Sequence, residues 1–348
     1  MTLGTLMIRA DASVAIGTGH VMRCLALAQK WQDSGGRAVF AMTESTPSLG
    51  RSLHTQGMQV VELKSSAGTA DAKELARVAQ DHDATWVVVD GYAFDSEYQC
   101  TLKNAGLNLT FLDDYGQCGR YSADLVLDQN ANAKEAMYRN REPYTRLLLG
   151  ARFALLRREF RQRGPWTREI PGVARRLLIT IGGSDPDNLT LGLIQTLQRN
   201  SALNVETTVV VGGSNPDLGR LQRTAQAARR PMRIVSDARN MAEIMAQSDM
   251  AIICGGGTLW ELLYMGCPTL SYSRGAVQAG IVAELEAAGI IRNLGPVGDF
   301  DEGKLTDAVE DLAVSRHGRE KMSLHGPTLV DGHGVDRVFQ CLATEKAA

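Results

Sequence analysis

The sequence alternates between short apolar segments that end in polar residues or glycine and longer stretches with helical spacing. This alternation constrains the fold more than any other feature of the chain. Thr85-Trp-Val-Val-Val-Asp90 is the clearest of the apolar segments. An unbroken run of this kind is typical of a parallel strand that is covered on both faces. Strands that alternate with helices predict an α/β fold with a parallel sheet, in which ligands bind beyond the carboxyl ends of the strands.

The alternation is interrupted between Arg157 and Arg176, where glycine, proline and basic residues occur without sustained periodicity. A chain of 348 residues is also long enough for two domains. We therefore predict two doubly wound, Rossmann-like α/β domains that face a cleft, over residues 1–164 and 165–334, followed by a C-terminal helix over 335–348. The expected strands are 6–10, 37–42, 59–63, 85–90, 107–112 and 123–128 in the first domain and 177–181, 205–211, 232–235, 250–253 and 268–272 in the second.

Composition argues against several classes of function. The formal net charge of -2 gives no basic surface for nucleic acid or an anionic membrane. The six cysteines are scattered without paired spacing, which favours free thiols over a structural zinc site. The first residues lack the basic segment of a signal peptide, and no apolar run approaches the roughly 20 residues that span a bilayer. We therefore expect a cytoplasmic monomer that binds neither nucleic acid nor membrane.

A glycine-containing loop, Gly17-Thr-Gly19, joins the first expected strand to a helix, and His20 lies where that helix begins. The amino end of a helix carries unpaired N–H groups and a partial positive charge, so it attracts anions and disfavours an imidazolium ion. A neutral His20 could accept a proton near pH 7. The alternative is a common glycine turn followed by a histidine without a chemical role. The dinucleotide fingerprint is absent, because Met22 stands where its third glycine is required.

A second glycine loop, Gly255-Gly256-Gly257, follows an expected strand and precedes another helix. Its backbone N–H groups can approach a phosphate closely, and Gly182-Gly183-Ser184 offers the same chemistry from a neighbouring strand. Two such loops suit a diphosphate. Glu261 has two interpretations: with Thr258 it fits a capping box, which the spacing favours, or it accepts hydrogen bonds from the hydroxyl groups of a ribose.

Taken together, these segments resemble a known family, the nucleotide-sugar hydrolases of pseudaminic acid biosynthesis. That family removes UDP from UDP-2,4-diacetamido-2,4,6-trideoxy-β-L-altropyranose. It is related to the MurG-type UDP-GlcNAc glycosyltransferases and shares their GT-B architecture. The resemblance covers nearly the whole chain in order, through residues 9–11, 17–24, 89–92, 113–114, 127–130, 148–150, 155–160, 182–188, 255–261, 266–268 and 331–334.

The resemblance implies roles for individual residues. It makes His20 the catalytic base, places Tyr92 beside the sugar, and assigns the ribose to Glu261. Gln278 would lie near the phosphates, which the glycines of the two loops would hold. One residue departs from the family pattern: Val277 stands where an asparagine, whose amide could contact sugar or phosphate, usually precedes this glutamine.

The mechanism expected from this assignment is direct attack of water on the anomeric carbon, with UDP as the leaving group and without a metal or a cofactor. Asp11 or Asp90 would orient the imidazole of His20, and the sequence does not choose between them. The predicted catalytic residues are His20, Tyr92 and Asp11. The predicted substrate contacts are Gly17, Gly19, Arg23, Gly182, Gly183, Ser184, Gly255, Gly256, Gly257, Thr258, Glu261 and Gln278. The rival functions are a GT-B glycosyltransferase that uses a UDP-amino sugar and a non-catalytic nucleotide-sugar binding protein.

Overall fold

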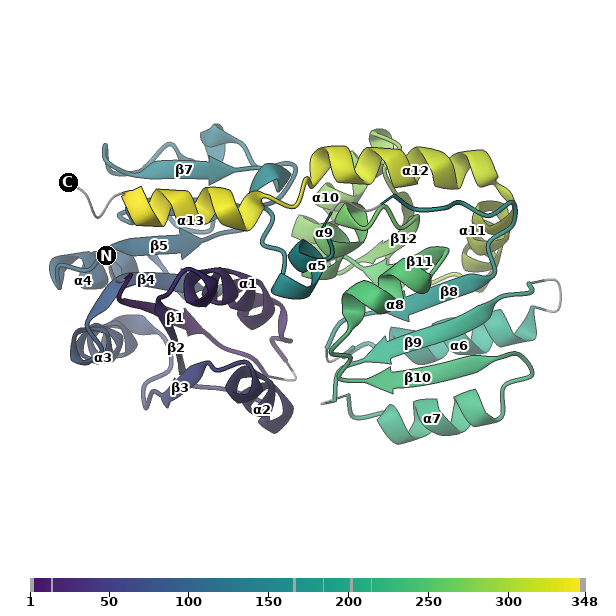
Figure 1. Cartoon of the computed structure of the whole chain (residues 1–348), viewed down its shortest axis with the longest axis horizontal. Coiled ribbons are helices and arrows are strands. Elements are labelled where there is room, and N and C mark those ends of the chain that lie inside the picture. The colour runs from purple at the N-terminus through teal and green to yellow at the C-terminus, as the bar shows by residue number, and fades with distance from the viewer. Residues whose placement is uncertain are drawn as a thin grey trace. The chain divides into compact units, whose positions relative to one another are not determined.

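The computed structural model of the chain describes residues 3–13, 15–164, 167–183, 185–200, 203–213 and 215–344. It divides into two compact units (Figure 1). Unit 1 comprises Met1–Arg158 together with Gly332–Ala348, and unit 2 comprises Glu159–Asp331. The boundaries expected from the sequence, after residues 164 and 334, lie close to these but assign the C-terminal helix to no domain.

Unit 1 contains a seven-stranded sheet in which all neighbouring strands are parallel. The strand order is β3-β2-β1-β4-β5-β6-β7, so the chain builds outward from β1 in one direction and then restarts at β4 in the other. This order is that of a doubly wound sheet. The strands are β1 (Thr5–Ala10), β2 (Arg37–Met42), β3 (Gln59–Glu62), β4 (Ala84–Asp90), β5 (Leu109–Leu112), β6 (Leu125–Asp128) and β7 (Arg146–Leu149).

Helices cover both faces of this sheet. Because successive side chains of a strand point to opposite faces, Leu6 and Ile8 of β1 pack in one core while Met7 packs in the other. The first core includes side chains of α1 (Gly19–Asp33) and α2 (Pro47–Thr55), and the second includes those of α3 (Gly68–Asp81) and α4 (Ser96–Asn104). The short helices η1 (Glu135–Tyr138) and η2 (Ala151–Phe153) follow β6 and β7.

The last helix, α13 (Gly334–Thr344), returns to unit 1, as the yellow ribbon in Figure 1 shows. Val335, Val338 and Leu342 are fully buried in the same core as α1. The indole N–H of Trp86, on β4, donates to the carbonyl oxygen of Leu342 at 2.9 Å. The C-terminal helix is therefore part of the core of unit 1.

Unit 2 contains a six-stranded parallel sheet of order β10-β9-β8-β11-β12-β13, again doubly wound. Its core joins Ile179, Val209 and Ile252 of the sheet to helices α6 (Leu189–Arg199) and α11 (Glu302–Val314). The strands are β8 (Arg176–Thr180), β9 (Glu206–Val211), β10 (Met232–Ser236), β11 (Met250–Cys254), β12 (Thr269–Ser273) and β13 (Arg292–Pro296). The helices are α5 (Arg158–Gln162), which begins at the last residue of unit 1, α6 (Leu189–Arg199), α7 (Leu218–Gln226), α8 (Met241–Gln247), α9 (Gly257–Tyr264), α10 (Gly275–Ala287), α11 (Glu302–Val314) and α12 (Arg316–Leu329), with the short helix η3 (Val297–Asp299).

The predicted α/β fold class is confirmed, and each expected strand is present with ends that differ by at most two residues. Two strands were missed, β7 and β13, and both lie at an edge of their sheet. An edge strand is covered less completely and therefore need not be a continuous apolar run. β13, with the sequence Arg-Asn-Leu-Gly-Pro, illustrates this.

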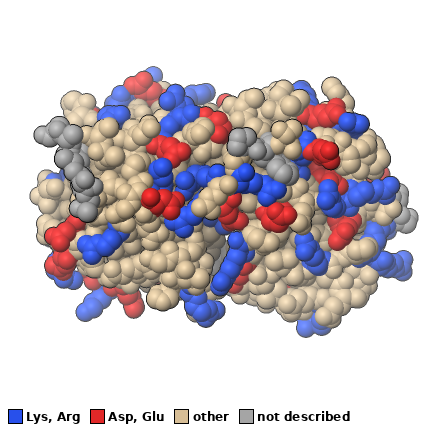
Figure 2. All heavy atoms as spheres, in the orientation of Figure 1, with Lys and Arg blue, Asp and Glu red and all other residues tan. Residues whose placement is uncertain are grey.

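The surface carries both signs of charge. On the face shown in Figure 2, Lys and Arg side chains lie among Asp and Glu side chains. Within the part of the chain that the structure describes, the helices lack the combination of length and apolar composition that a membrane crossing requires.

Candidate active site

The predicted site residues gather where the strand order of each sheet reverses. In unit 1 the reversal lies between β1 and β4: the loop after β1 leads to His20 on α1, and Asp90 is the last residue of β4. In unit 2 it lies between β8, which precedes Gly182, and β11, which precedes Gly255. Ligands of doubly wound proteins bind at this point of the sheet, beyond the carboxyl ends of the strands.

His20 is held by Asp90. Nδ1 of the imidazole lies 2.6 Å from Oδ1 of Asp90, and the two residues are 9% and 0% exposed. An ionised carboxylate only accepts hydrogen bonds, so in the neutral imidazole Nδ1 carries the proton and Nε2 keeps its lone pair. Of the two carboxylates that the sequence left open, Asp90 is therefore the one that orients the imidazole.

Arg23, one turn along α1 from His20, joins two carboxylates. Its Nε and Nη2 donate to the two oxygens of Asp90, each at 2.6 Å, and its Nη1 donates to Oδ1 of Asp114 at 2.6 Å. Nη2 also lies 3.3 Å from Nδ1 of His20, but a protonated Nδ1 cannot accept from it. This pairing, in which Asp90 receives two parallel hydrogen bonds, fixes the carboxylate that holds the imidazole.

The charges of this group stabilise one another. Burial opposes ionisation of Asp90, but the neighbouring Arg23 and His20 outweigh it and hold the pKa of Asp90 well below its usual value. The pKa of Asp114 is likewise lowered, since Arg23 outweighs burial. For Arg23, burial favours the neutral form, yet the two carboxylates raise its pKa further above the usual value. Asp90 therefore stays ionised at neutral pH.

Tyr92 lies beside His20 and is partly open to solvent. The edge-to-face contact between the two rings has a centroid distance of 4.8 Å, and Tyr92 is 58% exposed. Its hydroxyl donates to Oδ2 of Asp114 at 2.9 Å. Partial burial and the charge of Asp114 raise the pKa of Tyr92, so its hydroxyl stays protonated at neutral pH. The exposed ring can contact a ligand that reaches the imidazole.

Asp11 lies in a different group. Its carboxylate accepts the backbone N–H and the hydroxyl of Thr43 at 2.7 and 2.9 Å, and it pairs with Arg9 at 2.7 Å. These contacts anchor the start of the loop that leads to Gly17, which has a φ of +79°, and Gly19, the first residue of α1. The structure does not bring Asp11 into contact with His20.

Two further residues complete the group in unit 1. Asp114 follows β5 and Asn130 follows β6, and the Nδ2 group of Asn130 donates to Oδ1 of Asp114 at 3.1 Å. The sequence carried a signal for both, because polar residues follow the apolar runs of these strands. The contact of Asp114 with Arg23 and with Asn130 depends on the order of the strands, which the pattern does not specify.

In unit 2, the glycine loops have backbone conformations that side chains rarely adopt. Gly182 has a φ of +103°. Gly255 has a φ of +44°, and a Cβ there would come within 2.6 Å of Oε1 of Gln278. Gly183 follows Gly182 in the same loop, and Ser184, also predicted to contact the substrate, lies outside the described residues. The backbone at Gly182 and the space beside Gly255 therefore both require glycine.

The second glycine loop leads directly into α9. The helix begins at Gly257, after Gly256, and no side chain of the described residues caps it. Its first N–H groups therefore remain as potential donors to an anion. Thr258 is the second residue of the helix, so the capping-box interpretation, which made it the residue before the helix, is wrong. Glu261 is 8% exposed in the same helix, three residues further on.

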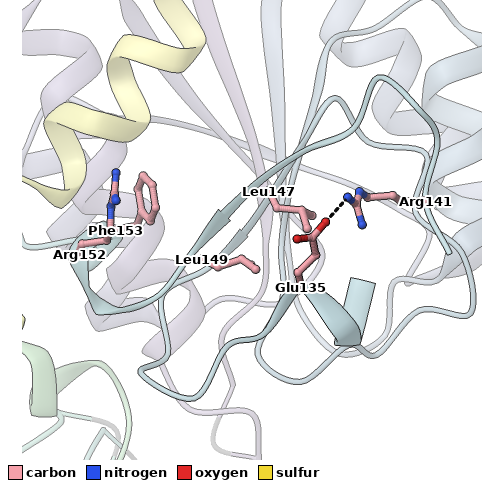
Figure 3. A pocket seen from close by; sticks show the side chains of 6 residues that line it. All are labelled: Glu135, Arg141, Leu147, Leu149, Arg152 and Phe153. Atoms are coloured by element: carbon pink, nitrogen blue, oxygen red, sulfur yellow. Dashed lines mark hydrogen bonds and ion pairs between the residues drawn. The ribbon is translucent and has the colours of Figure 1, made fainter. Parts of the chain in front are cut away.

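A separate pocket of about 430 Å³ lies in unit 1 (Figure 3). Its charged side chains include Glu135 and Arg141, which pair with each other at 2.7 Å. None of its lining residues was among the predicted catalytic residues or substrate contacts, and none belongs to the His20 group. Among the residues that the structure describes, there is no group of three or more His, Cys, Asp or Glu side chains suited to a metal ion. The lining residues are Glu135, Arg141, Leu147, Leu149, Arg152 and Phe153.

Curated relatives are similar at low identity, and no family model matches the chain. A UDP-2,4-diacetamido-2,4,6-trideoxy-β-L-altropyranose hydrolase of Campylobacter jejuni is 27% identical over 75% of this chain and 88% of that protein. An uncharacterised protein of Methanocaldococcus jannaschii is 25% identical over 76% of this chain. The spore coat polysaccharide biosynthesis protein SpsG of Bacillus subtilis is 26% identical over 48% of this chain. The matches span only 54% and 50% of the lengths of the last two proteins.

Solved structures match over nearly the whole chain. MurG of Acinetobacter baumannii has a TM-score of 0.66 and 14% identity, over 98% of this chain and 99% of that one. The glycosyltransferase of kitacinnamycin has a TM-score of 0.64 and 14% identity, over 97% and 98% of the two chains. With its two parallel α/β sheets of seven and six strands, the chain has the fold of the GT-B glycosyltransferases.

Proposed function

We propose that the protein is a nucleotide-sugar hydrolase that releases UDP from a UDP-linked 2,4-diacetamido-2,4,6-trideoxy hexose. The observation that carries the proposal is the contact of 2.6 Å between Nδ1 of His20 and the buried carboxylate of Asp90. This contact directs the lone pair of Nε2 away from Asp90, as a general base requires. A protein that only binds nucleotide sugars has no need for an imidazole oriented in this way.

In the proposed reaction, Nε2 of His20 takes a proton from water while the water oxygen bonds to the anomeric carbon of the sugar. The bond between that carbon and the β-phosphate oxygen breaks, and its electron pair leaves with UDP. Asp90 stabilises the positive charge that the imidazole acquires. A single displacement of this kind inverts the anomeric configuration.

We assign the binding of the nucleotide to unit 2. The N–H groups of the two glycine loops would donate to the phosphates and stabilise the charge that develops on the β-phosphate. Glu261 would accept hydrogen bonds from the ribose hydroxyls, and Gln278 lies against Gly255 at the second loop. Tyr92, with its ring partly exposed beside His20, would contact the sugar.

The sugar is proposed from the C. jejuni relative, which is named as a hydrolase of a substrate of this class. The spore coat polysaccharide protein supports carbohydrate chemistry more broadly. Val277, beside Gln278, is the residue of this chain that bears most directly on the choice of sugar, because the family resemblance predicts an asparagine there.

The test is proton NMR of the purified protein with UDP-2,4-diacetamido-2,4,6-trideoxy hexoses, in the absence of any acceptor. We expect free UDP and free sugar, whose first-formed anomer is inverted. His20→Ala should lower turnover by roughly 10²–10⁴-fold and leave UDP affinity nearly unchanged. Near-normal turnover by His20→Ala would refute the assignment of His20 as the general base.

A GT-B glycosyltransferase is the second candidate, favoured by the match to MurG and other glycosyltransferases over nearly the whole chain. Such an enzyme would bind the same UDP-sugar but transfer the sugar to an acceptor. It would release almost no UDP in the reaction without acceptor and much more when an acceptor is added. Intact substrate under both conditions, with tight binding, would instead indicate a binding protein.

A further inference from the structure

We propose that Arg274 binds the phosphate groups of the nucleotide, in competition with the carboxylate of Asp187. The inference rests on the proposed function and deepens it, because it adds a cationic side chain to the glycine loops assigned to the diphosphate. Arg274 was not singled out by the sequence analysis. It lies directly after β12 and before α10.

Arg274 is linked to both glycine loops of unit 2. Its backbone N–H donates to Oε1 of Gln278 at 2.8 Å, and that oxygen lies against Gly255. Nε of its guanidinium group donates to Oδ2 of Asp187 at 2.7 Å, in the loop that follows β8. Loops after three strands, β8, β11 and β12, therefore meet at this arginine, at the carboxyl edge of the sheet.

The hydrogen bonding of the guanidinium group is incomplete. Nη2 is shielded from solvent, and no hydrogen-bond partner for it occurs among the described residues. Oδ1 of Asp185 is 3.9 Å away, beyond hydrogen-bond distance. A buried donor without an acceptor is unfavourable, and the five donors of arginine match the oxygens of a phosphate. A phosphate beside the glycine loops would supply the acceptor that Nη2 lacks.

The two carboxylates near Arg274 differ in how firmly they are held. Asp185 is 5% exposed, and its oxygens accept the backbone N–H groups of Leu189 and Thr190 at 3.1 and 2.9 Å, at the start of α6. By contrast, the side chains of Asp187 and Arg274 are 45% and 36% exposed. Ion pairs that are this accessible contribute little to stability, so a phosphate can replace Asp187 at low cost.

If Asp187 competes with phosphate for Arg274, substitutions of these two residues should change the affinity for phosphate in opposite directions. Loss of the arginine should weaken phosphate binding, whereas loss of the competing carboxylate should strengthen it. A purely structural ion pair between the loops predicts instead that the two substitutions act alike. The sign of the Asp187 effect therefore distinguishes a binding residue from a structural one.

The experiment is calorimetric titration of the full-length protein with UDP and, separately, with uridine. For Arg274→Gln we expect UDP to bind at least roughly ten-fold more weakly, with uridine affinity unchanged, since a hydrogen bond to a charged group is lost. Asp187→Asn should bind UDP more tightly than the wild type. The matched control is Arg292→Gln, which breaks another exposed arginine–aspartate pair of unit 2, with Asp311. It should leave UDP affinity unchanged.

Unchanged UDP affinity in Arg274→Gln, with a wild-type melting temperature, overturns the inference. An equal loss of uridine and UDP affinity also overturns it, because the arginine then supports the loops rather than the phosphates. Inorganic pyrophosphate separates this inference from the proposed function. Binding of pyrophosphate that depends on Arg274, without binding of UDP, upholds Arg274 as a phosphate-binding residue and refutes the assigned nucleotide. Binding of neither ligand refutes both.

Discussion

Oδ1 of Asp90 lies 2.6 Å from Nδ1 of His20 and accepts a second hydrogen bond, also of 2.6 Å, from Nη2 of Arg23. One carboxylate oxygen thus contacts both an imidazole and a guanidinium group on the same face of α1. Arg23 keeps this carboxylate ionised, and the ionised carboxylate keeps the proton of His20 on Nδ1. The three side chains act as a unit in which only Nε2 of the imidazole is left to react.

Asp90→Asn tests this relationship. The asparagine amide can donate to Nδ1, which would move the proton to Nε2 and leave the wrong nitrogen available. We expect turnover of the UDP-sugar to fall by roughly 10²–10⁴-fold, while UDP affinity measured by calorimetry stays within a few-fold.

Asp124→Asn is the matched control for that substitution. It breaks the ion pair of 2.6 Å between Asp124 and Lys103, which lies at the amino ends of β5 and β6, away from His20. Its turnover should remain near that of the wild type. Equal losses of turnover in the two variants would mean that Asp90 matters for folding and not for the tautomer of His20.

Glu261→Ala tests the assignment of the ribose. Because α9 begins at Gly257, Glu261 does not belong to a capping box with Thr258, so its removal costs no cap of that kind. We expect UDP affinity to fall by roughly ten-fold or more, as for a hydrogen bond to a charged group. Thr258→Ala should change it little. If Glu261→Ala lowers only the melting temperature, the glutamate is a structural residue.

Asp128→Asn tests a pH-dependent contribution to stability. Asp128 is fully buried, and its hydrogen bonds are a donated N–H from Asn130 at 2.9 Å and the hydroxyl of Tyr138 at 2.8 Å. Burial, aided by the charges of Asp114 and Asp113, outweighs these bonds and raises the pKa of Asp128 from 3.8 to about 6. The folded state therefore binds this proton more tightly than the unfolded state, so stability is lost as the pH rises from about 4 through about 6.

The raised pKa of Asp128 corresponds to a loss of about 3 kcal/mol in the free energy of unfolding at pH 8, where the folded protein holds a buried carboxylate. Asparagine has the same shape and no charge. We expect Asp128→Asn to raise the free energy of unfolding at pH 8 by about 1–3 kcal/mol and to have little effect at pH 4, measured by urea denaturation. A constant difference between the two proteins from pH 4 to pH 8 would exclude titration of Asp128 as the cause.

Leu342→Ala tests the contribution of α13 to the core of unit 1. Leu342 is fully buried beside residues of α1, so the substitution should lower the free energy of unfolding of unit 1 by about 2–5 kcal/mol. The control is Leu324→Ala on α12, where the side chain is 70% exposed. That variant should stay within about 0.5 kcal/mol of the wild type in urea denaturation. Similar stabilities for the two variants would show that α13 is not needed for the core.

The sequence was most informative about the elements that are buried on both sides. The run from Thr85 to Asp90 predicted β4 almost to its ends. The glycines after two other apolar runs predicted the glycine loops, and the positive φ angles of Gly182 and Gly255 explain why glycine occurs there. The first residues of helices were predicted less accurately. A difference of one residue, between Gly257 and Thr258, decides whether Glu261 belongs to a capping box.

Contacts between distant segments were beyond the sequence pattern. The partners Arg274 and Asp187 are 87 residues apart, and Asp90 and His20 are 70 residues apart. The pattern offered Asp11 and Asp90 equally as partners of His20. Strand order and side-chain direction decide the choice, because Asp11 turns toward Thr43 at the end of β2 while Asp90 faces α1.

The return of α13 to unit 1 affects the order in which the protein folds during synthesis. Val335, Val338 and Leu342 belong to the core of unit 1 but are synthesised only after the whole of unit 2. Unit 2, from Glu159 to Asp331, is continuous in the chain and complete before them. The nascent chain can therefore complete unit 2 before the carbonyl of Leu342 exists to accept the hydrogen bond from Trp86 of unit 1. Of the two units, the one whose translation begins first is thus the last to complete its core.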